Sequence, residues 1–234
     1  MIKTVPVVAG VGITRFASDR PDCNPRDLLA EAVLALLADT GMAHLRAVQH
    51  GLCSYESDHF NKQMTLAAIL HDQIGLLPTP TVRVEGGGAT GALALRTAWA
   101  YIQSGLCDSI LVYGCETNGR GVSSQTANQL FALSADFDWE MMIGGTYTGF
   151  YAAMMRAHMD KYGTTPEQFA HVAVRNRQNA QYNPLAQKPM DISIADVLNS
   201  RPVAEPYRLL DCSLLSDGAA AMLFARLASA TSPA

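Results

Sequence analysis

Strand-like and helix-like segments alternate along the first half of this chain, and this alternation restricts the fold more than any other feature. Short apolar runs are followed by longer segments whose apolar residues recur at helical spacing. The strand-like runs cover residues 5–12, 47–54, 81–85 and 109–114, and the helical segments cover residues 24–41, 62–74 and 89–104. Such alternation predicts an α/β fold whose right-handed crossovers build a mostly parallel sheet.

Residues that favour helix ends support this assignment. Asn24 followed by Pro25 is typical of a helix N-terminus, and Gly41 of a helix end. Thr165-Pro166 with Gln168 forms the pattern of a capping box further along the chain. We therefore expect well-defined helices at both places.

The first strand-like run and the second half of the chain carry further expectations. Residues 5–12 are apolar almost throughout, which predicts a strand buried on both faces. Residues 117–148 are polar, glycine-rich and aperiodic, and we expect them to form a long functional loop. Two helices are predicted over 149–162 and 165–182, and a last buried strand over 219–225.

Composition excludes several functional classes. The 234 residues carry a net charge of -4, and the basic residues form no cluster, so the chain has no electrostatic footprint for nucleic acid. Membrane association is not expected, because no apolar stretch is long enough to span a bilayer and no signal peptide is recognisable; a cytoplasmic location is expected. The five cysteines include no C-x-x-C pair and the histidines no H-E-x-x-H motif, which predicts no metal site.

The sequence Val-Arg-Val-Glu-Gly-Gly-Gly-Ala-Thr-Gly over residues 82–91 is the strongest candidate for a ligand site. Backbone N–H groups and a helix N-terminus meet where such a strand turns into a helix. Gly86, Gly88 and Gly91 also match the dinucleotide motif G-x-G-x-x-G, with Glu116 as a possible ribose-binding acid. A third interpretation needs no ligand, because the glycines could serve only a tight turn.

Several blocks of sequence resemble one known family in their order and spacing. Residues 84–91 are similar to the thiolase segment V-[EN]-x-x-C-A-S-G, and residues 104–116 to the S-G-x-x-D and V-L-V-x-G-x-E that follow it. Further matching blocks lie at residues 159–168, 197–202 and 209–221. The chain thus resembles the thiolase superfamily, in particular sterol-carrier-type thiolases and their thiolase-like relatives described as lipid-transfer proteins or acetyl-CoA acetyltransferases.

The resemblance implies a fold and its division. It corresponds to the first βαβαβαββ half of a two-half fold, together with the inserted helical loop domain that covers the active site. The implied division is residues 1–116 for the α/β half, 117–207 for the insertion, and 208–234 for the final strand and tail. The second half, which carries the catalytic histidine and second cysteine of the family in G-H-P and C-x-G-G motifs, has no counterpart in this sequence.

The implied activity concerns acyl-CoA thioesters, with coenzyme A thioesters as substrate or ligand and no bound cofactor. The family's nucleophilic cysteine is replaced by Gly88, which can offer only a backbone N–H, so no catalytic residue is assigned. Substrate binding is assigned to Gly87, Gly88 and Ala89, and to Met154 and Met155, because methionine adapts to irregular apolar ligands.

Two alternatives remain open at this point: a subunit of a carbon–carbon lyase acting on CoA thioesters, and a non-catalytic module that binds acyl-CoA or lipid. Either way the resemblance implies a homodimer, or a hetero-oligomer with a thiolase-like C-terminal half or an OB-fold subunit. By the same resemblance, residues 81–85 are expected at a dimer contact.

Overall fold

The computed structural model describes residues 5–117 and 122–227. Among these, two compact units are distinguished. The sheet unit comprises residues 5–14, 19–117 and 217–227, and the insertion unit comprises residues 15–18 and 122–216. The division predicted from the sequence, with boundaries after residues 116 and 207, stays a prediction.

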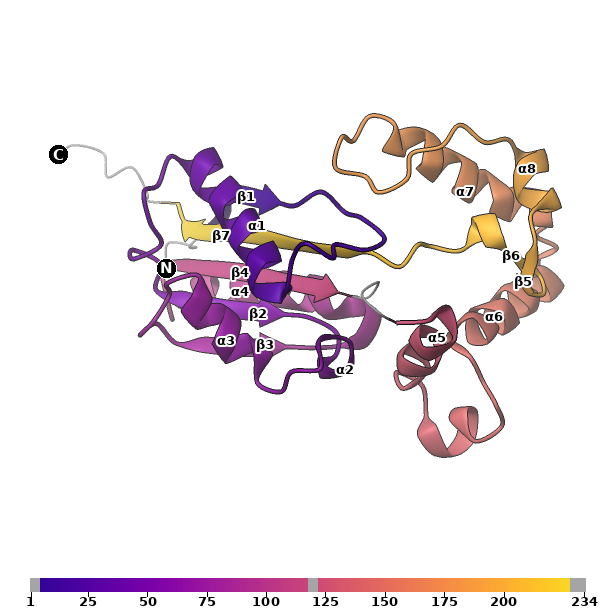
Figure 1. The fold of residues 1–234 in the computed structure, drawn as a ribbon, viewed down its shortest axis with the longest axis horizontal. Helices are drawn as coiled ribbons and strands as arrows, with labels where there is room; N and C mark the ends of the chain where they lie inside the picture. Colours follow the sequence, from indigo (N-terminus) through magenta and orange to yellow (C-terminus); the bar gives the residue numbers. More distant parts are fainter. Residues whose placement is uncertain (1–4, 118–121, 228–234) are drawn as a thin grey trace. The chain divides into compact units, whose positions relative to one another are not determined.

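Five strands form the central sheet of the sheet unit, in the order β1 (Pro6–Ile13), β7 (Asp217–Arg226), β4 (Ser109–Thr117), β2 (His50–Ser54) and β3 (Thr81–Val84) (Figure 1). Strand β2 is parallel to both β3 and β4, whereas β7 is antiparallel to both β4 and β1. Four strands therefore point the same way and only β7 opposes them. The predicted α/β fold with a mostly parallel sheet is confirmed.

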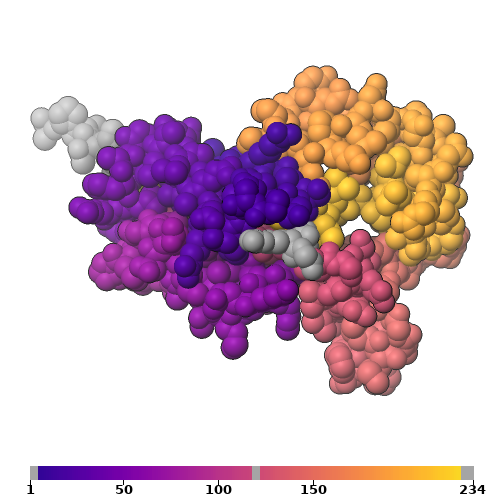
Figure 2. Space-filling view, in the orientation of Figure 1, coloured from indigo at the N-terminus to yellow at the C-terminus, as the bar shows by residue number. Residues whose placement is uncertain are grey.

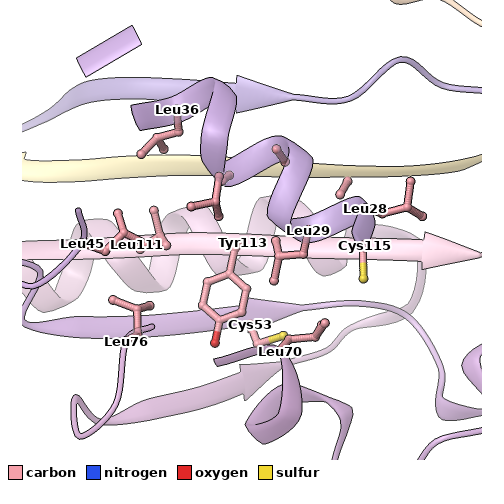
Figure 3. Close-up of a cluster of buried hydrophobic side chains, with 14 of the residues drawn as sticks. Leu28, Leu29, Leu36, Leu45, Cys53, Leu70, Leu76, Leu111, Tyr113 and Cys115 are labelled. Carbon is pink, nitrogen blue, oxygen red and sulfur yellow. The ribbon is translucent and has the colours of Figure 1, made fainter. Parts of the chain in front are cut away.

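Helices cover both faces of this sheet. On one face, α1 (Pro25–Thr40) and α3 (Leu66–Gln73) enclose an apolar core that includes Leu29, Leu111 and Tyr113 (Figure 3). On the other face, α4 (Thr90–Ser104) packs Ala94, Ala98 and Ile102 against β2 and β4. Burial of these two apolar clusters is the main contribution to the stability of the unit.

The capping residues act as predicted. The side chain of Asn24 accepts hydrogen bonds from the N–H groups of Arg26 and Asp27, and Pro25 is the first residue of α1. Gly41 ends that helix in the left-handed region at φ 69°, which glycine adopts without strain. Helix α4 ends in the same way at Gly105.

Two expectations for the sheet unit are wrong. Strand β1 lies at the sheet edge, where Val8 is 52% exposed and Ile13 is 42% exposed, so it is not buried on both faces. An apolar run shows that a strand can be buried but not whether a neighbouring layer covers it. The predicted helix over residues 62–74 is interrupted, because Lys62 and Thr65 have positive φ; a short α2 (Asp58–Asn61) precedes them, and α3 begins after them.

The insertion unit is mainly helical. Its helices are α5 (Ser124–Ala132), a π-helical turn (Phe137–Met141), α6 (Tyr147–Tyr162), α7 (Pro166–Ala180) and α8 (Ile194–Asn199). Two short strands, β5 (Pro202–Ala204) and β6 (Tyr207–Arg208), pair antiparallel, and a 3-10 turn (Leu209–Asp211) follows. The expectation of a loop throughout residues 117–148 is wrong, because α5 lies within that segment; its residues 118–121 lie outside the described chain.

No helix in the described part of the chain combines the length and the apolarity that a membrane span requires.

Candidate functional site

The carboxyl ends of the three mutually parallel strands meet at one edge of the sheet. Ser54 of β2 lies opposite Val84 of β3, and Cys53 lies opposite Tyr113 of β4. Continuing this register brings the residues that follow these strand ends to a common edge. In open α/β sheets this edge is where ligands bind.

A glycine turn joins β3 to α4 at this edge. A 3-10 turn (Gly87–Ala89) leads directly into the helix, and Gly87 has φ +55°, which favours glycine. Thr90 closes the turn: its Oγ1 accepts a hydrogen bond from the Gly86 N–H at 3.0 Å and donates one to the Gly87 carbonyl at 2.6 Å. The sequence therefore specifies both the turn and its hydrogen bonds.

The structure places Gly87, Gly88 and Ala89 side by side before α4, but their amides are not equivalent. The Gly87 N–H donates to the carboxylate of Glu85 at 2.6 Å, and the Ala89 N–H donates to the carbonyl of Gly86 at 3.1 Å. Two of the three amides expected to face a ligand thus already have partners within the turn. The binding role of these three residues stays a prediction.

Glu116 does not lie where a dinucleotide-binding acid should. Strand β4 extends to Thr117, so Glu116 is inside the strand rather than beyond it. One carboxyl oxygen accepts a hydrogen bond from the backbone N–H of Glu56, and the other is buried. Because a ribose hydroxyl needs an accessible acceptor, this arrangement disfavours the dinucleotide interpretation.

Arg83 organises a polar network beside the glycine turn. Its guanidinium donates to Asp58 and to the carbonyl of Glu56, both at 3.1 Å, and lies 4.0 Å from the ring centre of Tyr55. The Tyr55 hydroxyl donates to Asp58 at 2.8 Å. Sequence reasoning missed this network. Its only signal was a single charged residue, Arg83, inside the otherwise uncharged strand Thr-Val-Arg-Val.

Burial changes the protonation of the groups around this edge. It raises the pKa of Glu116 to about 7 and that of the Cys53 thiol to about 12. It also raises the pKa of Cys115, the thiol nearest in sequence to Glu116. A nucleophilic cysteine needs a lowered pKa, so neither thiol is suited to attack a thioester.

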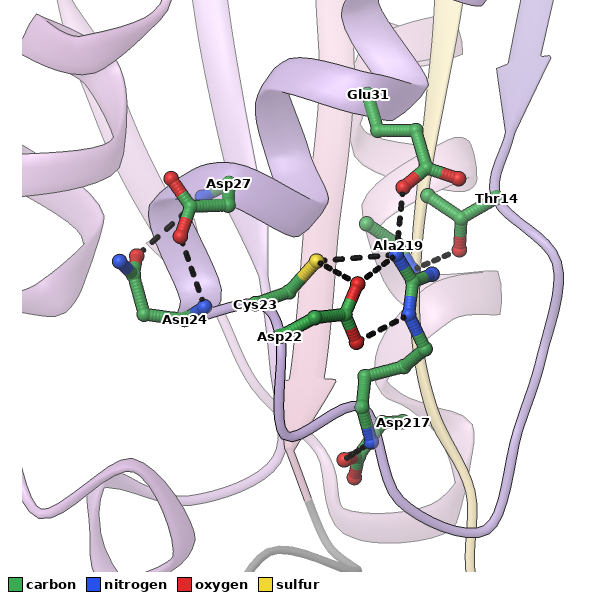
Figure 4. Close-up of polar contacts among 9 residues, drawn as sticks. Thr14, Asp22, Cys23, Asn24, Asp27, Glu31, Asp217 and Ala219 are labelled. Atoms are coloured by element: carbon green, nitrogen blue, oxygen red, sulfur yellow. Dashed lines mark hydrogen bonds and ion pairs between the residues drawn. The ribbon is translucent and has the colours of Figure 1, made fainter.

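A second polar cluster lies at the start of α1 and has a structural role (Figure 4). The Arg20 guanidinium pairs with Asp22 at 3.1 Å and with Glu31 at 3.0 Å, and it donates to the sulfur of Cys23. The Arg20 N–H donates to buried Asp217 at 2.9 Å. These bonds connect the segment before α1 to β7, and burial together with Asp22 raises the pKa of the Cys23 thiol.

A cavity of about 850 Å³ lies in the insertion unit. Its walls are aromatic and apolar, with Phe131 from α5 and Tyr147 and Tyr151 from α6. The rings of Phe131 and Tyr147 are 5.5 Å apart, and those of Tyr147 and Tyr151 are 5.0 Å apart. Asn128 and Arg201 add polar groups. Such a concave, mainly apolar space with a few polar groups suits a small organic ligand.

A smaller cavity of about 510 Å³ lies between α7 and residues 207–216. Figure 2 shows the insertion unit hollowed where the orange helix α7 faces the yellow segment. Asn176, Arg177 and Lys188 supply its polar and basic groups, whereas Tyr207 and Cys212 line both cavities. Burial raises the pKa of Cys212, which again disfavours a nucleophilic role.

The predicted methionines lie on α6 but line neither of these cavities. Met155 is 5% exposed and belongs to the packed interior of the unit, and Met154 is 56% exposed. The cavity wall is formed one to two turns earlier on the same helix, by Tyr147 and Tyr151. Gly88 belongs to the sheet unit and the methionines to the insertion unit, and the binding role of Met154 and Met155 stays a prediction.

Comparison with known proteins identifies the family. Residues 7–228 match the model of the thiolase N-terminal domain. The chain is 41% identical over 218 residues to an acetyl-CoA acetyltransferase of Methanothermobacter thermautotrophicus, covering 92% of this chain and 55% of that relative. It is 32% identical over 229 residues to sterol carrier protein 2 of Gallus gallus, covering 93% of this chain and 40% of that relative.

A solved structure agrees with these sequence matches. The chain superposes on a structure described as Ltp2-ChsH2(DUF35) aldolase with a TM-score of 0.78 and 28% identity, covering 95% of this chain and 56% of that one. The chain thus spans about half the length of the relatives it matches. The resemblance seen in the sequence motifs is confirmed, and the chain belongs to the thiolase N-terminal domain family.

Proposed function

We propose that this chain binds acyl-CoA thioesters and acts on them only as part of a larger assembly. The observation that carries this proposal is the aromatic cavity of the insertion unit, in a chain whose family includes acetyl-CoA acetyltransferases. Tyrosine and phenylalanine faces suit the thin, flexible pantetheine arm and an acyl chain. The exposed Arg201 offers a planar guanidinium of the kind that recognises phosphate.

The chain does not perform covalent acyl transfer at the glycine turn. In this proposal Gly88 occupies the family's nucleophile position, and burial raises the pKa values of the Cys53 and Cys115 thiols. Polarisation of a thioester carbonyl by a backbone N–H remains compatible with glycine. In this proposal the acid–base groups come from a thiolase-like second half or from a partner chain.

A carbon–carbon lyase subunit is the second candidate, and one observation favours it. The solved structure with a TM-score of 0.78 is described as an aldolase composed of Ltp2 and a DUF35 protein. A retro-aldol cleavage of a CoA thioester needs no nucleophilic cysteine, which fits Gly88. An OB-fold partner would then complete the enzyme. Turnover that requires the partner would support this candidate, whereas binding without turnover in its presence would support a lipid-binding module.

The sheet unit presents a surface suited to such a partner. Val11 of β1 lies opposite Met222, which packs with the α4 cluster, so Val11 points to the side of the sheet that α4 covers. Val11 itself is exposed, as are Leu95 and Trp99 on α4. We propose that a thiolase-like second half, or a second copy of this chain, covers these apolar side chains. Strand β3, at the opposite edge of the sheet, is the proposed dimer contact.

Calorimetry with acetyl-CoA tests the binding proposal directly. We expect micromolar affinity, about -8 kcal/mol, and no binding of NAD. Tyr151→Asp places a charge in the aromatic wall, and Arg201→Glu reverses the charge of the guanidinium. Each substitution should weaken the binding of acetyl-CoA at least tenfold. Arg156→Glu is the matched control, since Arg156 is exposed on α6 and lines neither cavity. Binding of NAD without acetyl-CoA would overturn the proposal.

A further inference from the structure

The carboxyl group of Glu116 is buried with only one of its oxygens hydrogen-bonded. Oε1 accepts the backbone N–H of Glu56, whereas Oε2 is one of two buried side-chain atoms without a hydrogen-bond partner among the described residues. The other such atom is Nε of Arg83. Buried polar atoms without partners are rare, because leaving one unpaired is unfavourable. Both occur in one network.

This network connects Glu116 to the segment that borders the glycine turn. Glu56 bridges the two groups, because its N–H donates to Glu116 and its carbonyl accepts from Arg83 at 3.1 Å. The same guanidinium pairs with Asp58 at 3.1 Å. One residue further along β4, Thr117 donates to Asn61 of α2 at 2.8 Å. Residues 56–61 are therefore held to the sheet edge by side chains of β3 and β4.

We propose that Glu116 is a proton-linked positioning residue whose ionisation competes with Asp58 for the Arg83 guanidinium and thereby shifts residues 56–61. With its proton bound, Glu116 is neutral and Arg83 stays paired with Asp58. When the proton leaves, a buried negative charge has one backbone N–H as its partner. A buried charge strongly favours a nearby cation, and Arg83 has a donor, Nε–H, that the existing contacts do not use.

The charges around Glu116 leave Arg83 as the counter-ion. Cys53 of β2 and Glu56 of the following segment face the carboxyl group of Glu116. When Cys53 or Glu56 is negatively charged, it disfavours the ionised form of Glu116. Cys115 precedes Glu116 on β4. Buried Asp217 of β7 lies opposite Thr117, the residue after Glu116, in the β4–β7 strand pair. Burial raises the pKa of Glu116, the hydrogen bond from the Glu56 N–H and then the charge of Arg83 lower it, and the pKa lies at about 7. The ionisation of Glu116, and with it the proposed shift of residues 56–61, therefore occurs near neutral pH.

Amide NMR on the intact chain without ligand tests this inference independently of the proposed function. Between pH 5.5 and 8.5 we expect the amide resonances of Glu56, Asp58 and Asn61 to shift with a common midpoint near 7. Glu116→Gln keeps an acceptor for the Glu56 N–H but cannot ionise, so the titration should disappear while the fold is retained. Asp19→Asn removes an exposed carboxylate of the same unit and should leave the titration unchanged.

Asp58→Asn supplies a second, quantitative test. Weakening the competitor frees Arg83 to stabilise ionised Glu116, so the midpoint should fall by about one pH unit. A midpoint that stays near 7 in this variant would overturn the competition. A titration that persists in Glu116→Gln would overturn the assignment to Glu116. Acetyl-CoA binding plays no part in either readout, so a failure of the proposed function would leave these results interpretable.

Discussion

Glycine at position 88 determines which reactions the α4 N-terminus can support. The turn and its helix are formed, and we propose that Gly88 stands where the family has its acyl-carrying cysteine. We predict that incubation with acetyl-CoA followed by peptide mass spectrometry finds no acetyl adduct on residues 82–91. An acetylated peptide in this range would contradict both the assignment of Gly88 and the proposal of a non-covalent role.

The substitution Gly88→Cys should place a reactive thiol at the N-terminus of α4. A helix N-terminus lowers the pKa of a thiol, which increases the thiolate fraction at pH 7 by about tenfold. We expect iodoacetamide to alkylate the new cysteine roughly ten times faster than a cysteine introduced by Leu34→Cys, an exposed position within α1. Equal alkylation rates would show that the α4 N-terminus does not activate a thiol.

His71 makes the stability of the sheet unit depend on pH. It is buried, and it bonds the Tyr113 hydroxyl at 3.0 Å and the Thr79 carbonyl at 2.8 Å, so one ring nitrogen accepts and the other donates. Burial lowers the pKa of His71. The folded state therefore binds the proton less readily than the unfolded state, and the contribution of neutral His71 is present above about pH 6.5 and lost at lower pH.

Comparing the wild type with His71→Phe separates the contribution of His71 to stability from that of Glu116. The raised pKa of Glu116 changes stability with pH in the opposite direction. His71→Phe keeps a ring but cannot take a proton. We expect the wild type to be the more stable of the two at pH 7, by about 1–3 kcal/mol for the lost hydrogen bonds, and this difference to shrink toward pH 5. Urea unfolding at both pH values measures it. A difference independent of pH would refute the role of His71.

At the scale of elements, the sequence predicted the long helices α1 and α7, whose ends carry local signals. Asn24-Pro25 and Thr165-Pro166 specify α1 and α7, because a cap satisfies N–H groups that the helix itself leaves unpaired. Short elements such as α8 and the β5–β6 pair were missed, since they are too short to show a period. Their stability depends on packing with segments distant in sequence.

The candidate site was predictable to a similar extent. The glycine turn was found because strand, glycines and helix are adjacent in sequence. The cavity was not, because its wall combines Phe131, Tyr151 and Tyr207 from three separate segments. On α6 the sequence pointed to Met154 and Met155, whereas the helix turns Tyr147 and Tyr151 toward the cavity. Which face of a helix meets a cavity depends on tertiary packing rather than on residue type.

Close packing of β1 on α1 gives a prediction for two glycines. A Cβ at Gly12 would collide with the α1 backbone at Ala32 and Leu36, whereas a Cβ at Gly91 of α4 would meet no atom within 4 Å. Gly12→Ala should destabilise the chain by about 3 kcal/mol, as overpacking against backbone does. Gly91→Ala should stabilise it by up to about 1 kcal/mol through helix propensity. Denaturant unfolding measures both, and equal effects would contradict the close approach.

At the scale of the molecule, the two faces of the sheet are unequal. The face under α1 and α3 is closed over a large apolar cluster, whereas the face under α4 leaves apolar side chains of β1 exposed. Trp99 on α4 is 47% exposed as well. Large apolar side chains that are exposed on the same side of a sheet are candidates for an interaction surface. We therefore propose that another polypeptide covers these exposed side chains.

Oligomeric state tests this conclusion. We predict that light scattering at micromolar concentration gives a mass above the 25.1 kDa of a single chain. Val11→Asp and Trp99→Asp should each weaken association at least tenfold, because a charge on the apolar surface must be desolvated when the surface is covered. Leu34→Asp is the matched control, since Leu34 is exposed on α1, which packs on the other face of the sheet. A folded 25.1 kDa monomer, unaffected by any of the three substitutions, would contradict an interface on the α4 side.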